Sequence, residues 1–215
     1  MGKSIRSASL TIANVKHFHL SSGVTLWLVP SRNVASKLKS LMHIRPNAQN
    51  EASYPEFEPH ITLASLPNNS SIPLDKLRNA IPALQPRFQV DFESVNVGDH
   101  FFRSVYLAIK SSSELQLLHE HVHQALGVQP RTPAYPHVSL CYITEEDAAA
   151  GERDRYYHEL EVQGRIRKEG ETLSLNCNDR EHPDWISGFE VSEVWIADCT
   201  GPVKEWKVLD KILFV

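Results

Sequence analysis

The sequence predicts an α+β fold, with two similar lobes that each carry an antiparallel sheet covered by helices and that enclose a central cleft. Apolar runs of strand length alternate with segments that repeat hydrophobic residues at helical spacing. One short pattern, proline, histidine, a β-branched residue, a hydroxyl residue and leucine, occurs at Pro59–Leu63 and again at Pro136–Leu140. The length of 215 residues allows one domain. We expect that domain to span residues 23–215.

Signals at element ends define the first half. Ser31 is placed to cap a helix, and Pro73 stands where a helix begins, because a missing N–H does little harm there. The dipeptide Gly98-Asp99 favours a hairpin turn. The expected elements are a strand at 24–29, a helix at 31–45, a strand at 60–65, a helix at 73–82 and strands at 88–97 and 101–109.

Similar signals divide the second half. Gly127 ends one helix, and Thr144 with Asp147 resembles a capping box that opens a second, charged helix. A polar insertion at about 164–187 is expected to be a long loop with one short strand near Leu173. The remaining expected elements are helices at 113–126 and 144–162 and strands at 137–143, 189–198 and 204–214.

Composition excludes several classes of protein. The formal net charge of −4 disfavours a surface that binds long nucleic acid, because such binding needs clustered Lys and Arg. No apolar run approaches the roughly 18 residues that a membrane span requires. Three cysteines, Cys141, Cys177 and Cys199, form neither a disulfide framework nor a metal-binding pair, so we expect an intracellular, cytoplasmic location. The polar residues 1–22 are expected to form a flexible tail. We also expect the protein to be a monomer.

The repeated motif carries the chemistry. Side chains alternate along a strand, so His60 and Thr62 point away from the face that Ile61 and Leu63 present to the core. The same holds for His137 and Ser139. If the lobes pack with these faces inward, two imidazoles and two hydroxyls meet in one cleft.

Such a set suits hydrolysis of a phosphodiester. One imidazole can take a proton from water and the other can protonate the departing oxygen, since histidine titrates near neutrality. The hydroxyls can donate hydrogen bonds to the phosphoryl oxygens, where charge builds in the transition state. This chemistry requires neither a metal ion nor another cofactor.

These motifs resemble those of the 2H phosphoesterase superfamily, and within it the 2′,3′-cyclic-nucleotide 3′-phosphodiesterases of fungi and plants. The resemblance covers roughly residues 24–214, with further similarity at Leu26–Leu28, Gly98, Phe101-Phe102, Val105–Leu107, Tyr135 and Val194–Asp198. It implies a bilobal, metal-independent enzyme that opens nucleoside 2′,3′-cyclic phosphates to 2′-phosphates and ADP-ribose 1″,2″-cyclic phosphate to the 1″-phosphate. These small molecules are by-products of tRNA splicing. A Golgi association, as in some fungal relatives, stays open.

The resemblance also implies roles for the motif residues. His60 and His137 become the acid–base pair, with His137 favoured as the base and His60 as the acid, and Thr62 and Ser139 hold the phosphate. Aromatic side chains near a phosphate can stack on a base or ribose. Phe102, Tyr135 and Trp195 are the candidates for that contact.

Three other interpretations stay open. The segment His119–His123 satisfies the H-E-x-x-H pattern of zinc peptidases, although no third ligand follows at a recognised spacing. A second branch of the 2H superfamily processes RNA ends or 2′-5′ linkages with the same two motifs. Finally, the chain could be a nucleotide-binding module without catalysis, which turnover of a cyclic nucleotide would exclude.

Overall fold

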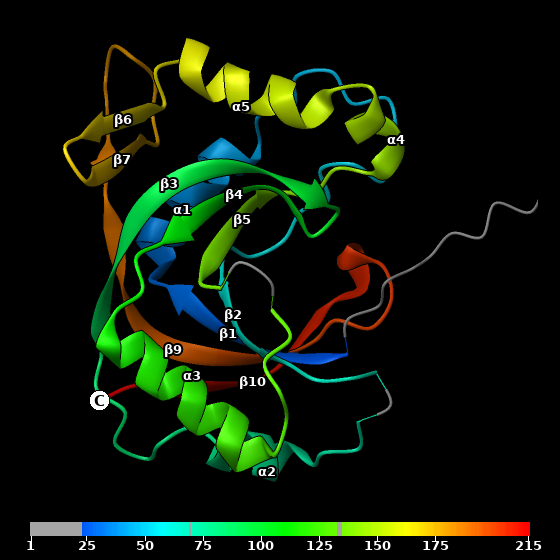
Figure 1. The fold of residues 1–215 in the computed structure, drawn as a ribbon, viewed down its shortest axis with the longest axis vertical. Helices are drawn as coiled ribbons and strands as arrows, with labels where there is room; N and C mark the ends of the chain where they lie inside the picture. Colours follow the sequence, from blue (N-terminus) through cyan, green and yellow to red (C-terminus); the bar gives the residue numbers. More distant parts are fainter. Residues whose placement is uncertain (1–22, 69, 133–134) are drawn as a thin grey trace, which may run out of the picture.

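A computed structural model describes residues 23–68, 70–132 and 135–215 (Figure 1). The expected tail, residues 1–22, lies outside the described residues. The helices are α1 (Arg32–Met42), α2 (Leu74–Asn79), α3 (Ser113–Leu126), α4 (Glu145–Ala149), α5 (Glu152–Val162) and the short 3-10 helix η1 (Val203–Glu205). The strands are β1 (Val24–Pro30), β2 (Ile61–Ser65), β3 (Phe88–His100), β4 (Arg103–Ile109), β5 (His137–Cys141), β6 (Ile166–Glu169), β7 (Thr172–Asn176), β8 (Trp185–Ile186), β9 (Gly188–Asp198) and β10 (Lys207–Leu213).

An antiparallel sheet of seven strands forms the centre of the molecule, in the order β1-β2-β5-β4-β3-β9-β10. The two motif strands, β2 and β5, are neighbours and pair through Ile61 and Val138. Because β1 also pairs with β9, the sheet closes on itself. The predicted α+β class is confirmed. The expected sheets of the two lobes form one continuous sheet, which the β2–β5 and β3–β9 pairs join.

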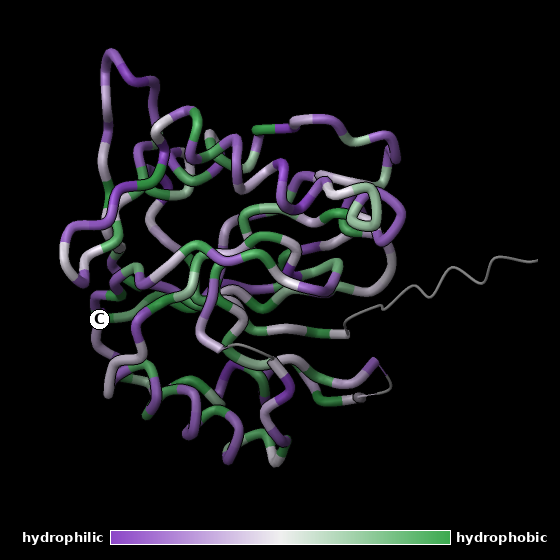
Figure 2. Tube along the Cα trace, turned by 45° about the horizontal axis from the view of Figure 1, so that its top comes forward, coloured by the Kyte–Doolittle hydropathy of each residue, from purple (hydrophilic) through white to green (hydrophobic). Residues whose placement is uncertain are grey.

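Helices cover the sheet on opposite sides. In Figure 1, α2 and α3 lie at the bottom of the view, whereas α4 and α5 lie at the top. Contacts join α3 to β2, α1 to β1 and β5, and α5 to β3 and β4. Figure 2 shows that hydrophobic residues concentrate in the central strands. The core includes fully buried leucines from β1, α1, β2 and β5, among them Leu26, Leu28, Leu38, Leu41, Leu63 and Leu140.

Sequence signals at helix ends predict the observed caps. Val34 N–H donates to the predicted cap, the Ser31 hydroxyl, whereas Leu115 N–H donates to the hydroxyl of Ser112, a cap that was not predicted. Gly127 ends α3 in the left-handed conformation, with φ +69°. These local contacts explain why the start of α1 and the end of α3 follow from the sequence, whereas α1 ends at Met42, before the expected residue 45.

The hairpin turn differs from the prediction. Strand β3 continues through Gly98 and Asp99 to His100, and the turn lies at Phe101-Phe102. The register of the β3–β4 pair shifts between Val97 and His100, so Gly98 lies in an irregular part of the ladder. A Cβ atom on Gly98 would lie 1.9 Å from the Arg103 carbonyl oxygen. Close approach of two backbones, rather than a turn, explains this glycine.

Two other expectations in the second half were wrong. The helix expected at 144–162 is two helices, because Gly151 adopts φ +84° between α4 and α5. The insertion at 164–187 holds a three-stranded sheet, β6-β7-β8, where a loop with one strand was expected. Leu173 and Leu175 are buried on β7 and anchor this small sheet to the core. Among the described residues, no helix is long and apolar enough to cross a membrane.

The close approach at Gly98 predicts a large stability loss for Gly98→Ala. The added methyl group would overlap the Arg103 backbone, so the free energy of unfolding should fall by about 3 kcal/mol. Gly170→Ala is the matched control, since a Cβ there meets nothing within 4 Å and only the positive φ of +61° opposes it, at about 1 kcal/mol. Urea denaturation measures both. Equal losses would show that the backbone contact at Gly98 is unimportant.

Candidate active site

The two motifs open into one cavity. His60, Thr62, His137 and Ser139 all line a cavity of about 710 Å³, called the motif cavity below. In the antiparallel β2–β5 pair, Ile61 lies opposite Val138, which places Thr62 across from His137 and His60 across from Ser139. Ile61 and Val138 themselves are fully buried on the other face. The structure therefore brings the four residues together as the alternation of side chains predicts.

His60 is held in one orientation. Its ring stacks on Trp27 with centroids 4.0 Å apart and an interplanar angle of 14°. Its Nδ1 lies 2.6 Å from the carbonyl oxygen of Glu58, which can only accept, so Nδ1 carries the proton and Nε2 is the acceptor. Burial lowers the pKa of His60 to about 4, the Glu58 hydrogen bond opposes this shift, and the charge of His137 adds to it. His60 is thus neutral near pH 7 when the cavity holds no anion.

The second motif has its own supports. The Tyr106 and His137 rings form a T-shaped contact with centroids 5.3 Å apart. The Ser139 hydroxyl donates to the carbonyl oxygen of Phe102 over 2.8 Å. Tyr142, which directly follows the end of β5, also lines the motif cavity, and burial raises the pKa of its phenol. Tyr142 is therefore a hydroxyl donor beside the motif.

The structure adds residues that the sequence did not single out. Trp27, Arg103 and Arg131 line the motif cavity. Arg103 donates to Asp99 over 2.6 Å and lies 5.7 Å from the centre of the Tyr106 ring. Trp27 could have been found from its alternation with buried Leu26 and Leu28 on one strand. The arginines lie outside any motif, and no pattern in the sequence marks them.

The three aromatic candidates differ in position. Phe102 lines the motif cavity. Tyr135 instead stacks on His119 with centroids 4.1 Å apart, and its hydroxyl donates to the Leu115 carbonyl over 3.4 Å. Trp195 lies across from Trp27 in the β1–β9 pair, with the Lys211 ammonium 3.7 Å from its ring centre. Tyr135 therefore packs against α3 and Trp195 packs beside Trp27, and neither is part of the cavity lining.

The H-E-x-x-H segment lies on α3. His119 and His123 have ring centroids 4.1 Å apart, and His123 Nδ1 lies 2.8 Å from the His119 carbonyl oxygen. A hydrogen bond to its own helix thus occupies one nitrogen of His123. Within residues 23–68, 70–132 and 135–215, no group of three or more His, Cys, Asp and Glu side chains is arranged to hold a metal ion.

Comparisons with known proteins agree with this geometry. A family described as "Cyclic phosphodiesterase-like protein" matches residues 22–214. A "2′,3′-cyclic-nucleotide 3′-phosphodiesterase" of Yarrowia lipolytica is 26% identical over 216 residues, which cover 87% of this chain and 97% of that protein. A "Cyclic phosphodiesterase" of Arabidopsis thaliana is 24% identical over 142 residues, or 65% of this chain and 77% of its own length.

Solved structures show the same fold. The apo form of E. coli LigT aligns with a TM-score of 0.50 at 14% identity, covering 90% of this chain and 98% of LigT. LigT complexed with 3′-AMP aligns with the same TM-score at 15% identity and the same coverage. The match of the family to residues 22–214 includes both motifs and all described strands. This chain belongs to the cyclic phosphodiesterase-like protein family, as its paired motifs predicted.

Proposed function

We propose that this chain hydrolyses nucleoside 2′,3′-cyclic phosphates to nucleoside 2′-phosphates, with His60 and His137 as the acid–base pair. The observation that carries the proposal is the convergence of both motifs on one cavity. The names of the relatives from Yarrowia and Arabidopsis support the substrate class. ADP-ribose 1″,2″-cyclic phosphate presents the same strained phosphate ring and is the second proposed substrate.

In the proposed reaction, His137 takes a proton from a water molecule. The water oxygen attacks phosphorus, the bond from phosphorus to O3′ breaks, and His60 gives its proton to O3′. The 2′-phosphate remains. Because charge on either imidazole disfavours charge on the other, a protonated His60 favours a neutral His137, as an acid and a base together require. The imidazoles supply both proton transfers, so the reaction needs no metal ion.

His60 must be protonated to act as the acid. The buried, neutral ring of the free protein gains that proton when the anionic phosphate enters, since a nearby negative charge favours the imidazolium. The hydrogen bond from Nδ1 to Glu58 then keeps Nε2 directed at the leaving oxygen. We propose that substrate binding and activation of the acid are the same event.

Hydroxyl groups bind the phosphate in this proposal. Thr62 donates from β2, and Ser139 donates from β5 after its hydroxyl turns away from the Phe102 carbonyl. Tyr142 adds a third donor beside Ser139. The half-buried ring of Phe102 offers aromatic surface for the base or ribose.

Replacing either histidine should abolish most of the activity. His60→Ala and His137→Ala should each lower kcat by about 100-fold to 10,000-fold, the usual contribution of a general acid or base. The assay uses protein treated with EDTA and 2′,3′-cyclic AMP, and phosphorus NMR assigns the product as the 2′-phosphate or the 3′-phosphate.

His119→Ala is the matched control, because this histidine lies on α3 outside the motif cavity. It should keep near-normal turnover. Near-normal rates in both motif variants, or a 3′-phosphate product, would contradict the proposal. Activity that disappears with EDTA, returns with zinc and depends on His119 would favour the peptidase-like zinc site.

The pH dependence of catalysis should be bell-shaped. Rate falls at low pH as the base gains a proton, and at high pH as the acid loses its proton. Because the bound phosphate favours protonated His60, the alkaline limb of kcat should lie at higher pH than that of kcat/KM. Steady-state kinetics between about pH 4 and pH 10 measure both limbs. A flat profile would rule out a two-histidine mechanism.

Burial of neutral His60 should make the fold sensitive to acid. Its pKa is about 4 when folded and about 6.5 when unfolded, so the unfolded chain binds more protons between these values. The stability contribution is complete above about pH 6.5 and is lost as pH falls toward 4, by about 3 kcal/mol in total. Urea denaturation of wild type and His60→Asn at pH 7 and pH 4 measures the contribution of His60 to the free energy of unfolding. Parallel losses in the two proteins would assign the effect to other groups.

A further inference from the structure

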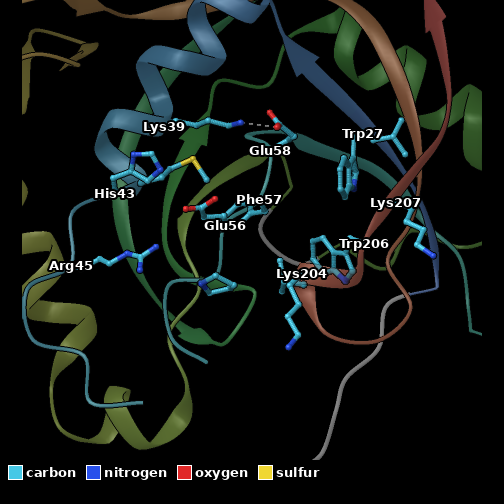
Figure 3. Close-up of a pocket in the computed structure, with 14 residues that line it drawn as sticks. Trp27, Lys39, His43, Arg45, Glu56, Phe57, Glu58, Lys204, Trp206 and Lys207 are labelled. Carbon is cyan, nitrogen blue, oxygen red and sulfur yellow. Dashed lines mark hydrogen bonds and ion pairs between the residues drawn. The ribbon is translucent and has the colours of Figure 1, made fainter. Parts of the chain in front are cut away.

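A second cavity adjoins the motif cavity. It has a volume of about 270 Å³, and its lining includes Trp27 and Trp206 (Figure 3), which also line the motif cavity. The two indoles lie 5.9 Å apart between ring centroids and contact each other at an angle of 51°. Trp27 also contacts the first motif, because its ring stacks on His60. A molecule in the motif cavity therefore lies next to this second space.

Positive charge gathers around the second cavity, which we call the basic cavity. Its lining includes four cationic side chains, Lys39, Arg45, Lys204 and Lys207, and two carboxylates, Glu56 and Glu58. Lys39 and Glu58 neutralise each other across 2.6 Å. In the part of the chain that the structure describes, neither Arg45 nor Lys204 forms an ion pair. The protein as a whole has a formal net charge of −4, so this excess of cations is local.

The cations are held by ordered backbone from distant parts of the chain. Arg45 follows α1, in a segment fixed when Asn47 N–H donates to Glu152 over 2.8 Å. Glu152 is fully buried. Lys204 belongs to η1 and Lys207 begins β10. Figure 3 shows Arg45 on the opposite side of the cavity from Lys204 and Lys207. The side chains of Arg45, Lys204 and Lys207 are exposed, so the fold fixes their backbone positions and leaves their charged ends accessible to a ligand.

We propose that the basic cavity binds a second phosphate group of the substrate, so that the preferred substrate carries a phosphate beyond its cyclic one. This inference rests on the proposed function of the motif cavity. Guanidinium and ammonium groups hydrogen-bond phosphate oxygens, and Arg45 and Lys204 are free to do so. The half-buried indole of Trp206, which lines both cavities, gives the connecting ribose or base an apolar surface between the two phosphates. A diphosphate bridge and a phosphodiester of an RNA end both supply this phosphate.

The test compares three substrates. 2′,3′-Cyclic AMP has only the cyclic phosphate, ADP-ribose 1″,2″-cyclic phosphate adds a diphosphate, and the dinucleotide ApA with a 2′,3′-cyclic end adds a phosphodiester. The double variant Arg45→Ala/Lys204→Ala removes two cations of the basic cavity. Arg32→Ala/Lys168→Ala removes the same net charge from exposed positions outside both cavities.

We expect a selective loss. The Arg45→Ala/Lys204→Ala protein should lose about tenfold or more in kcat/KM, through KM, on one or both substrates with a second phosphate. Its kcat/KM for 2′,3′-cyclic AMP should stay within about twofold of wild type, and the control double variant should match wild type throughout. Loss on the ADP-ribose compound alone identifies a diphosphate as the ligand, and loss on the dinucleotide alone identifies an RNA end. Unchanged kinetics, or equal loss on all three substrates, would overturn the subsite.

Binding separates this inference from the proposed reaction. ADP-ribose lacks the cyclic phosphate, so calorimetry with ADP-ribose reports the subsite even if the wild-type protein hydrolyses none of the three substrates. Its Kd should rise about tenfold in Arg45→Ala/Lys204→Ala and should not change in Arg32→Ala/Lys168→Ala. Equal Kd values in all three proteins would overturn the inference.

Discussion

The pairing of β2 with β5 is the constraint on which the rest of the site depends. One residue pair, Ile61 with Val138, joins the two motif strands, and both side chains are fully buried. Since side chains alternate along a strand, burying these two residues turns the flanking histidines and hydroxyls to the opposite face. A slip of one residue would send the histidines into the core and the apolar residues into the cavity. Hydrophobic burial therefore sets the geometry of the proposed chemistry.

The environment of His60 follows from the same arrangement. Strand β1 pairs with β2 and places the Trp27 indole against the imidazole, while the chain entering β2 supplies the Glu58 carbonyl. The stacked ring removes water from His60, and the carbonyl fixes its tautomer. Backbone and packing thus prepare the imidazole before any ligand is present.

Much of the fold is predictable because its signals are local. The cap at Ser31 and the terminal Gly127 act within one turn of the helices that they bound. The paired motif also reads directly from the sequence. Each copy lies within five consecutive residues.

Other features depend on contacts between distant segments. Gly98 looks like a turn residue in the sequence, but the backbone of Arg103 explains it. The small sheet β6-β7-β8 depends on the burial of Leu173 and Leu175 against the core. Tyr135 precedes the second motif in the sequence, but it contacts His119 on helix α3. Trp195 belongs to a segment that resembles the family, but its pairing with Trp27 in the β1–β9 ladder determines its position. These contacts cannot be predicted from composition or residue spacing, because they join segments that are distant in the sequence.

Closure of the sheet has a consequence for how the molecule forms. Strand β1 precedes the other described strands in the chain, yet one of its two partners is β9, at Gly188–Asp198, more than 150 residues later. Until β9 has been synthesised, β1 has an open edge, and the Trp27 indole lacks its cross-strand neighbour Trp195. Contacts between such distant segments are slow to form, because a long loop must close first. The motif cavity can therefore be completed only after β9 has been synthesised. Before that, the nascent chain exposes the edge of β1, to which another chain could pair.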